Sequence, residues 1–194
     1  LDWLPERRKT KVLEGEALAE LERKVWIARL QAAGEQGLNQ GEVALQPLTA
    51  AWQKLSSAQR QDAELLLAYA GQLRALGAQE EAEEVLRKAL KQGYDARLMR
   101  LYGQLRGRDP ARQLQTAEGL LKQHPQDPLL LLSLGRLCLQ NGLWGKAREY
   151  FEISLEFSRS AETCAELARL LASQGGAEGS NRLLQEVLVL QGQH

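Results

Sequence analysis

The sequence has few of the residues that build β-sheets. Of its 194 residues, only 12 are β-branched and 5% are aromatic, whereas 39 are leucine. Strands favour β-branched and aromatic side chains because these fit a pleated surface. Leucine, alanine, glutamine, glutamate and arginine instead lose little conformational freedom in a helix. The composition therefore predicts an all-α protein.

Cysteine and histidine are also scarce. The two cysteines (Cys138, Cys164) and two histidines (His124, His194) form no metal-ligand spacing, no CxxC motif and no disulfide framework. His124 lies in a proline-rich corner and His194 is the last residue, so neither is a good candidate for acid–base chemistry. We therefore expect no catalytic residues, no metal site and a reducing compartment, with both cysteines filling the core as small apolar side chains.

The charges balance, and no long apolar run occurs. Lys plus Arg equals Asp plus Glu at 25 each, so the chain offers no net positive field for a nucleic-acid backbone. No stretch approaches the roughly 18 apolar residues that a membrane-spanning helix needs. Nucleic-acid binding is thus not expected, and neither is a membrane span within this sequence.

A repeated spacing of small and large residues organises the chain. From Pro128 onward the pattern consists of Leu131, Leu134, Gly135, Cys138, Gly142, Ala147, Phe151 and Ser154. The same frame recurs from Ala63 and from Ala161, with Gly77 and Gly175 in the place of Gly142. These spacings are similar to the tetratricopeptide pattern, a helix-turn-helix of about 34 residues. One such pair cannot bury its apolar face alone, so the pattern predicts stacked pairs.

The predicted fold is a right-handed superhelical α-solenoid of tetratricopeptide-like helix pairs, with about ten helices. Small residues bring the two helices of a pair together, and Leu86, Phe151 and Leu184 are expected to fill the space between one pair and the next. The expected pairs lie near 14–55, 62–91, 96–123, 128–157 and 161–190, after a leading segment 1–13.

The first helix is expected to run from Glu14 to Ala33, with Leu18, Leu21 and Val25 on its apolar face and Gly34 and Gly37 ending it. Trp26, Trp52 and Trp144 are interpreted as packing anchors. Trp3 stands near the basic run Arg7, Arg8, Lys9 and Lys11, a combination that membrane interfaces favour.

The segment 134–155, LGRLCLQNGLWGKAREYFEISL, is more specific than a generic repeat. With the opening LDWLPERRKTKVL and the middle RLMRLYGQLRGRDPARQLQTAEGLLKQHPQDP, it resembles the HemY family, bacterial inner-membrane proteins associated with late protohaem biosynthesis. The resemblance implies an N-terminal membrane anchor that precedes this sequence, and a parent protein at the inner membrane. This domain would then be soluble, on the cytoplasmic side. No catalytic residue set comes with the family.

The first helix of each pair is expected to line a concave groove. One arginine per pair falls at nearly the same position (Arg74, Arg106, Arg136, Arg169), with apolar residues between. Arginine engages carboxylates through two parallel N–H donors, so the groove would suit a peptide bearing carboxylates. Arginine is also a good helix former on solvent-exposed faces, so the alternative that these arginines have no binding role stays open. The predicted partner-binding residues are Leu67, Arg74, Leu98, Tyr102, Arg106, Leu129, Leu132, Arg136, Leu139 and Arg169.

The function expected from these features is a non-enzymatic protein-interaction scaffold, with late haem-pathway enzymes as candidate partners. The alternative is a haem or porphyrin carrier, because the family works in this pathway. Such a carrier would need an axial ligand from Met99, Tyr94, Tyr102 or the two cysteines, and there is no CxxCH for covalent attachment. Each of these residues also fits a structural role, so no cofactor is expected.

Overall fold

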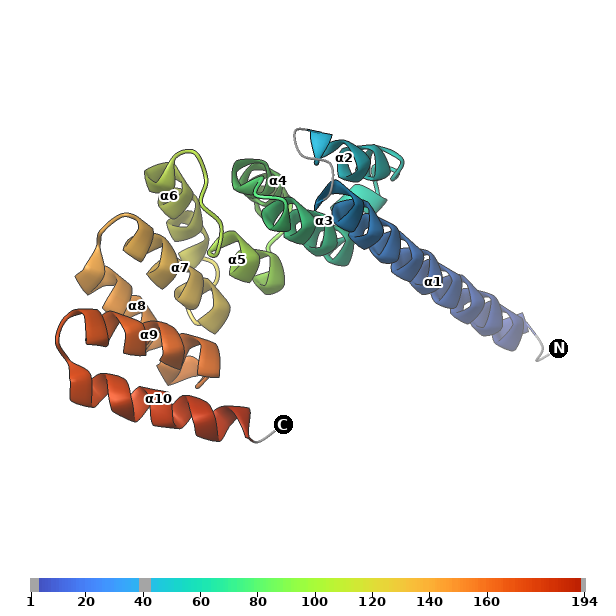
Figure 1. Cartoon of the computed structure of the whole chain (residues 1–194). Helices are drawn as coiled ribbons and strands as arrows, with labels where there is room; N and C mark the ends of the chain where they lie inside the picture. The colour runs from blue at the N-terminus through green and yellow to red at the C-terminus, as the bar shows by residue number, and fades with distance from the viewer. Residues whose placement is uncertain (1–3, 39–42, 193–194) are drawn as a thin grey trace. The chain divides into compact units, whose positions relative to one another are not determined.

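The computed structural model describes residues 4–38 and 43–192, and the side chains from residue 15 onward within them. These ranges contain ten α-helices, one short 3-10 helix and no strand, which confirms the predicted all-α fold (Figure 1). Trp3 and the side chains of the basic run at 7–11 lie outside the described residues. None of the helices described is both long and apolar enough to cross a bilayer.

The chain divides into two compact units, residues 1–78 and 79–194. Unit 1 holds α1 (Leu4–Leu38), α2 (Gln46–Gln53), a 3-10 turn (Gln59–Gln61) and α3 (Ala63–Ala75). Unit 2 holds α4 (Gln79–Gln92), α5 (Ala96–Tyr102), α6 (Pro110–Leu121), α7 (Pro128–Gln140), α8 (Trp144–Phe157), α9 (Ala161–Ser173) and α10 (Ala177–Gln191). The grouping of 62–91 as one pair stays a prediction, because α3 and α4 fall in different units.

In unit 1, α1 packs against α2 and α3 and is longer than expected. The prediction that Gly34 and Gly37 end it is wrong, since the helix passes through both and ends at Leu38. A Cβ on Gly34 would lie 2.0 Å from Oε1 of Gln72, and one on Gly37 would lie 2.1 Å from the carbonyl oxygen of Ala44. Both glycines therefore permit a close approach to neighbouring segments rather than stopping the helix.

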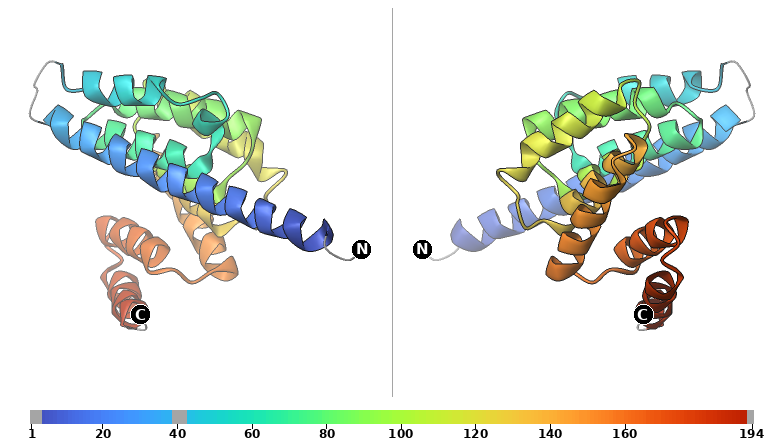
Figure 2. Two further views of the ribbon diagram at one scale, coloured as in Figure 1. Left: turned by 90° about the vertical axis from the view of Figure 1, so that its right-hand side faces the viewer. Right: turned by 90° about the vertical axis from the view of Figure 1, so that its left-hand side faces the viewer.

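The described N-terminal part of α1 has an exposed apolar stripe. Leu18, Leu21 and Val25, which the sequence places on the apolar face of this helix, are 57%, 59% and 50% exposed. Leu30 is fully buried, and the burial of α1 is concentrated toward its C-terminal end. The pattern of leucines could not distinguish a covered stripe from an uncovered one. Figure 2 shows α1 as the longest helix of the chain.

The helices of unit 2 start where the sequence places capping residues. The side chains of Asp95, Asp109, Asp127 and Ser160 accept hydrogen bonds from backbone N–H groups in the first turns of α5, α6, α7 and α9. Pro110 and Pro128 occupy the first helical positions, where the missing N–H has no partner to lose. These caps fix the starts of α5, α6, α7 and α9, whereas α8 and α10 begin without a side-chain cap.

The repeat frames are confirmed at their turns. Gly77, Gly142 and Gly175, which share one position of the pattern, have φ angles of 81°, 71° and 82°. Only glycine adopts this left-handed conformation readily, so it closes the turn after the first helix of each frame. The three matches in the sequence are therefore three copies of one turn.

Within unit 2, α7 packs on α8 and α9 on α10 as hairpins (Figures 1 and 2). Leu86 and Phe151 are fully buried, as expected, but Leu184 of α10 is 45% exposed. The expectation for Leu184 is wrong because no described helix covers that side of α10. Trp144 is 53% exposed at the start of α8, so it is not the predicted packing anchor. Trp52 does pack, stacking on Tyr69 with ring centroids 4.1 Å apart.

Candidate functional site

The helices α5, α7 and α9 of unit 2, labelled in Figure 1, each contribute charged side chains to one cluster. These are the first helices of the predicted pairs, so they are the expected lining of a groove. We call this surface the α5–α7–α9 face. Its polar members are Arg100, Gln104, Arg136, Glu162, Glu166 and Arg169.

Arg136 of α7 is the centre of this ionic cluster. Its Nε donates to Oε1 of Glu166 at 2.8 Å, and its Nη2 donates to Oε1 of Glu162 at 2.7 Å. Glu162 also accepts from Arg100 Nη2 at 2.6 Å and from Gln104 Nε2 at 3.3 Å. One glutamate of α9 thereby joins α5, α7 and α9.

The electrostatics of Glu162 follow from these contacts. Burial alone would raise the pKa of the Glu162 carboxyl, but the hydrogen bonds from Arg100 and Arg136 outweigh burial, and the pKa lies below its ordinary value. The carboxylate is therefore held in its charged form.

The cations of the cluster differ in exposure. The Arg136 side chain is 12% exposed, and its Nη1 is buried without a hydrogen-bond partner among the described residues. Arg100 and Arg169 are 52% and 69% exposed, whereas Glu162 and Glu166 are 24% and 14% exposed. The side chains of Arg100 and Arg169 thus reach the solvent, while Arg136 and both glutamates are largely covered.

The other three predicted arginines are Arg169 of the cluster, Arg106 and Arg74. Arg169 lies 3.6 Å from Glu166 and donates to the carbonyl oxygen of Ala165. Arg106 is exposed, but α5 ends at Tyr102, so Arg106 lies on the following loop and not on a helix as expected. Arg74 is exposed on α3 of unit 1, and Leu67 is half-buried on the same helix.

Three predicted groove residues are buried, so their expected exposure is wrong. Leu98 is 3% exposed, and Tyr102 and Leu132 are fully buried. Tyr102 faces α4, where its hydroxyl donates to Oε1 of Glu83 at 2.9 Å. The short helix α5 packs on both α7 and α4, and its residues Leu98 and Tyr102 are buried. Leu129 and Leu139, at either end of α7, are half-buried, as lining residues would be.

The sequence-based reasoning missed Arg100, Gln104, Glu162 and Glu166. Glu162 and Glu166 stand 26 and 30 positions after Arg136. That separation is close to one repeat, which is the signal that could have placed them on the neighbouring first helix. The predicted set contains the arginines that recur from repeat to repeat, but not the glutamates of α9 that pair with Arg136.

The candidate haem ligands lie in the core. Cys138, Cys164 and Met99 are fully buried, which confirms the structural role expected for the cysteines. Burial raises the pKa of Cys138 to about 11 and also raises that of Cys164, so neither is a thiolate at neutral pH. The Tyr94 hydroxyl donates to Asp127 at 2.8 Å, and its ring stacks on His124. Among the described residues no cluster of His, Cys, Asp and Glu could hold a metal ion.

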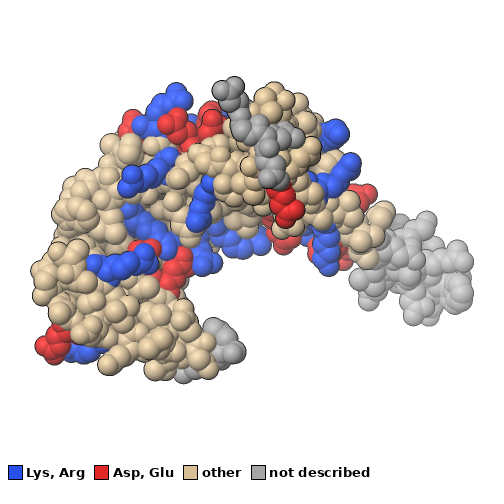
Figure 3. Space-filling view, in the orientation of Figure 1, with Lys and Arg blue, Asp and Glu red and all other residues tan. Residues whose placement is uncertain are grey.

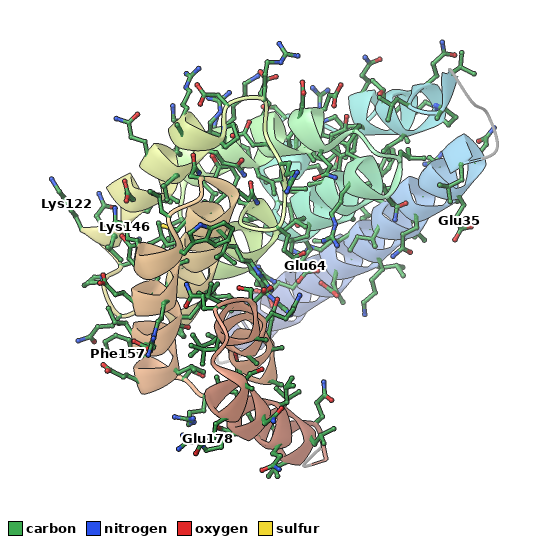
Figure 4. The ribbon with its side chains drawn as sticks, turned by 60° about the vertical axis from the view of Figure 1, so that its left-hand side comes forward. Glu35, Glu64, Lys122, Lys146, Phe157 and Glu178 are labelled. Atoms are coloured by element: carbon green, nitrogen blue, oxygen red, sulfur yellow. The ribbon has the colours of Figure 1, made fainter. Side chains whose placement is uncertain are left out.

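The opposite side of unit 2 has ion pairs of a different kind. A shallow hollow between α4 and α6 is lined by charged residues that pair locally, such as Arg87 with Glu83 at 3.3 Å and Arg108 with Glu80 at 3.0 Å. Lys146 of α8, labelled in Figure 4, pairs with Glu118 of α6 at 2.6 Å. In Figure 3, basic and acidic side chains lie next to one another on the visible face. Arg108 with Glu80 is an exposed pair, whereas Arg87 with Glu83 is about as covered as the pairs around Arg136.

Comparison with solved structures defines the class of protein as a tetratricopeptide-like helical repeat. The crystal structure of MamA has a TM-score of 0.54 at 15% identity, covering 82% of this chain and 95% of that one. A MamA fragment from Desulfovibrio magneticus RS-1 has a TM-score of 0.51 at 17% identity, covering 87% of this chain and 97% of that one. At these identities the likeness concerns the fold alone.

Among curated proteins, the chain is similar to Protein HemY of Escherichia coli K12, with 27% identity over 171 residues. Protein HemY of Shigella flexneri matches equally well. The matches cover 88% of this chain and 42% of the relatives, so the chain spans less than half the length of the curated relatives it matches. No family model matches the chain. The chain is thus similar to HemY proteins over most of its length, in agreement with the resemblance of its sequence motifs.

Proposed function

We propose that the chain is a protein-interaction scaffold whose α5–α7–α9 face binds a segment of a protein partner. One observation carries the proposal: Glu162 joins arginines of two other helices into a single cluster over three successive first helices. Largely covered ion pairs are weak evidence for stability, because the cost of desolvating the charges offsets much of their attraction, so stability alone is a weak reason for such a cluster. A polar surface held in a fixed geometry suits recognition.

We also propose, from the similarity to HemY proteins, that the partner is an enzyme of late protohaem biosynthesis and that the parent protein is held at the bacterial inner membrane. The chain itself would not be an enzyme. The charged groups of the cluster are engaged in ion pairs, and none of them is a nucleophile with an adjacent base. No contact in the structure favours the haem-carrier alternative, because its candidate ligands are enclosed or hydrogen-bonded.

The test uses the purified chain on a solid support and the purified enzymes that oxidise protoporphyrinogen and insert iron into protoporphyrin. We expect wild-type chain to retain one of them, and Arg136→Glu/Arg169→Glu to retain at least about tenfold less, because charge reversal puts like charges beside Glu162 and Glu166. Arg148→Glu/Arg182→Glu is the matched control, since both arginines are exposed on α8 and α10 away from the cluster.

Because Arg136 is nearly buried, its reversal could also unfold unit 2. The single variant Arg100→Glu avoids this problem, since that side chain is half-exposed. Thermal melting of each variant separates loss of fold from loss of binding. Retention that is equal for wild type and the folded Arg100→Glu and Arg169→Glu variants would overturn the proposal, as would failure of wild type to retain either enzyme.

A further inference from the structure

The charge of the partner segment can be inferred from the order of exposure in the cluster. Three guanidinium groups (Arg100, Arg136, Arg169) face two carboxylates (Glu162, Glu166), which leaves one positive charge in excess. The exposed members are the two outer arginines, while both carboxylates are largely covered. A basic segment would meet guanidinium groups before it reached a carboxylate. An acidic segment would meet its counter-charges directly.

The arginines of the cluster also have N–H groups that its two carboxylates do not fully satisfy. Glu162 is shared between Arg100, Arg136 and Gln104, so one carboxylate serves three donor side chains. Arg136 Nη1 has no hydrogen-bond partner among the residues described, and a buried polar atom without a partner is costly. The contact of Arg169 with Glu166, at 3.6 Å, is longer than a hydrogen bond. A further carboxylate could satisfy donors that the internal glutamates leave under-used.

From these observations we propose that the α5–α7–α9 face binds an acidic protein segment, and that Glu162 occupies the arginines as an internal competitor until a carboxylate of the partner displaces it from Arg100. This inference rests on the proposed function, since it names the chemistry of the segment bound at the same face. Arg100 is the point of exchange because it is more exposed than Arg136 and contacts the same carboxylate. Arg136 remains anchored to Glu166 during the exchange.

An internal competitor makes an unusual prediction, because removing it strengthens binding. Glu162→Gln keeps the size of the side chain but removes the charge that neutralises Arg100 and Arg136. Acidic ligands then meet a more positive face and have no carboxylate to displace. A site that binds basic ligands through Glu162 would instead lose affinity for those ligands in the same variant.

The probes are three fluorescent decapeptides of Gly and Ser that carry four Glu, four Gln or four Lys. We expect wild type to bind the Glu peptide best in fluorescence anisotropy, with affinity that falls as salt is added. Glu162→Gln should bind the Glu peptide about threefold tighter or more, and Arg100→Gln and Arg169→Gln about threefold weaker or more. Glu156→Gln, an exposed position of α8, is the charge-matched control and should leave binding unchanged.

Glu162→Gln could lower the stability of unit 2, so thermal melting of each variant accompanies the titrations. If Glu162→Gln does not fold, Glu162→Ala removes the same charge, and tighter Glu-peptide binding is again expected. Preference for the Lys peptide, or weaker Glu-peptide binding by a folded Glu162 variant, would overturn the inference.

The two proposals fail in distinguishable ways. Acidic-peptide binding together with no retention of either haem-pathway enzyme contradicts the proposed partner and leaves the acidic specificity standing. Retention of an enzyme that Arg100→Glu abolishes, together with no binding of the Glu peptide, contradicts the acidic specificity and leaves the scaffold function standing.

Discussion

Gly135 of α7 lies directly against the ring of Phe151 of α8, so close that a Cβ on Gly135 would stand 2.3 Å from the ring atom Cε1. Phe151 is fully buried, which means that its ring has no open space into which it could retreat. The missing side chain therefore sets the spacing of this hairpin.

Gly135→Ala is expected to lower the free energy of unfolding by about 1–3 kcal/mol, because the overlap with Phe151 outweighs the better helix propensity of alanine. Urea denaturation measures the change. Gly119→Ala is the matched control, since no atom lies within 4 Å of its added Cβ, and it should raise stability by up to about 1 kcal/mol. Equal stability of the two variants would contradict the close packing.

Gln113 organises the loop between α5 and α6. Its Nε2 donates to the carbonyl oxygens of Tyr102 and Leu105 at 3.0 and 3.1 Å, and its Oε1 accepts from the Gly107 N–H at 3.0 Å. The side chain is buried at 1% exposure. Gln113→Leu would remove all three bonds, and we expect a loss of about 2–4 kcal/mol in urea denaturation.

The control for Gln113 is Gln115→Leu, two positions further along α6 on the exposed side. Its effect should stay within about 0.5 kcal/mol, because an exposed substitution removes no internal contact. If both variants lost the same stability, the hydrogen bonds of Gln113 would not be what secures the loop.

The stability of unit 2 should depend on pH through Glu162. Its folded pKa lies below the ordinary value of 4.5, so the charged carboxylate stabilises the fold at pH values above 4.5. As pH falls through the folded pKa, this contribution is lost. Between about pH 5 and pH 3, wild type should lose unfolding free energy more steeply than Glu162→Gln. Urea titrations over that range test this, and parallel curves would contradict it.

The two cysteines should be inert in the folded protein. Both are fully buried, and burial raises the pKa of Cys138 to about 11. At pH 8, a thiol-specific reagent should react with wild type at the rate of unfolding, whereas Ser158→Cys, on an exposed position, should react at once. Rapid labelling of wild type would show that the core opens, and a cysteine thiolate would then again be a candidate haem ligand.

Leu155 and Leu188 stand at the same position of consecutive hairpins, four residues after Phe151 and Leu184. Leu155 is 6% exposed and Leu188 is 71% exposed. Leu155→Ala is therefore expected to cost about 2–4 kcal/mol and Leu188→Ala less than about 1 kcal/mol in thermal unfolding. Similar costs would mean that α10 is covered in solution, for example by another molecule, and repeating the melts at several protein concentrations would show it.

The sequence predicted best what is governed by local rules. The starts of α6 and α7 at Pro110 and Pro128 follow from proline geometry, and the turn at Gly142 follows from its need for a positive φ angle. These rules involve neighbours along the chain, so a single sequence contains them.

What depends on distant neighbours was harder to predict. The pattern of leucines did not reveal that Leu21 is exposed and Leu132 enclosed, because the covering helix is not part of either helix's own sequence. Of the predicted arginines, Arg136 lies on the α5–α7–α9 face with its side chain largely covered, and Arg106 lies on a loop. The partners of Arg136, Glu162 and Glu166, come from the next hairpin. They can be predicted only by comparing both acidic and basic residues between successive repeats.

Because Arg136 and Glu162 connect α5, α7 and α9 through ion pairs, salt acts differently on this face than on the apolar core. Hairpin interiors are held by apolar contacts that salt hardly weakens, whereas this face is held by ion pairs whose outer members are in contact with solvent. Dissolved ions shorten the reach of such charges to about 8 Å at physiological ionic strength. Added salt therefore weakens the ion pairs that join α5, α7 and α9, while the buried apolar contacts within and between the hairpins persist.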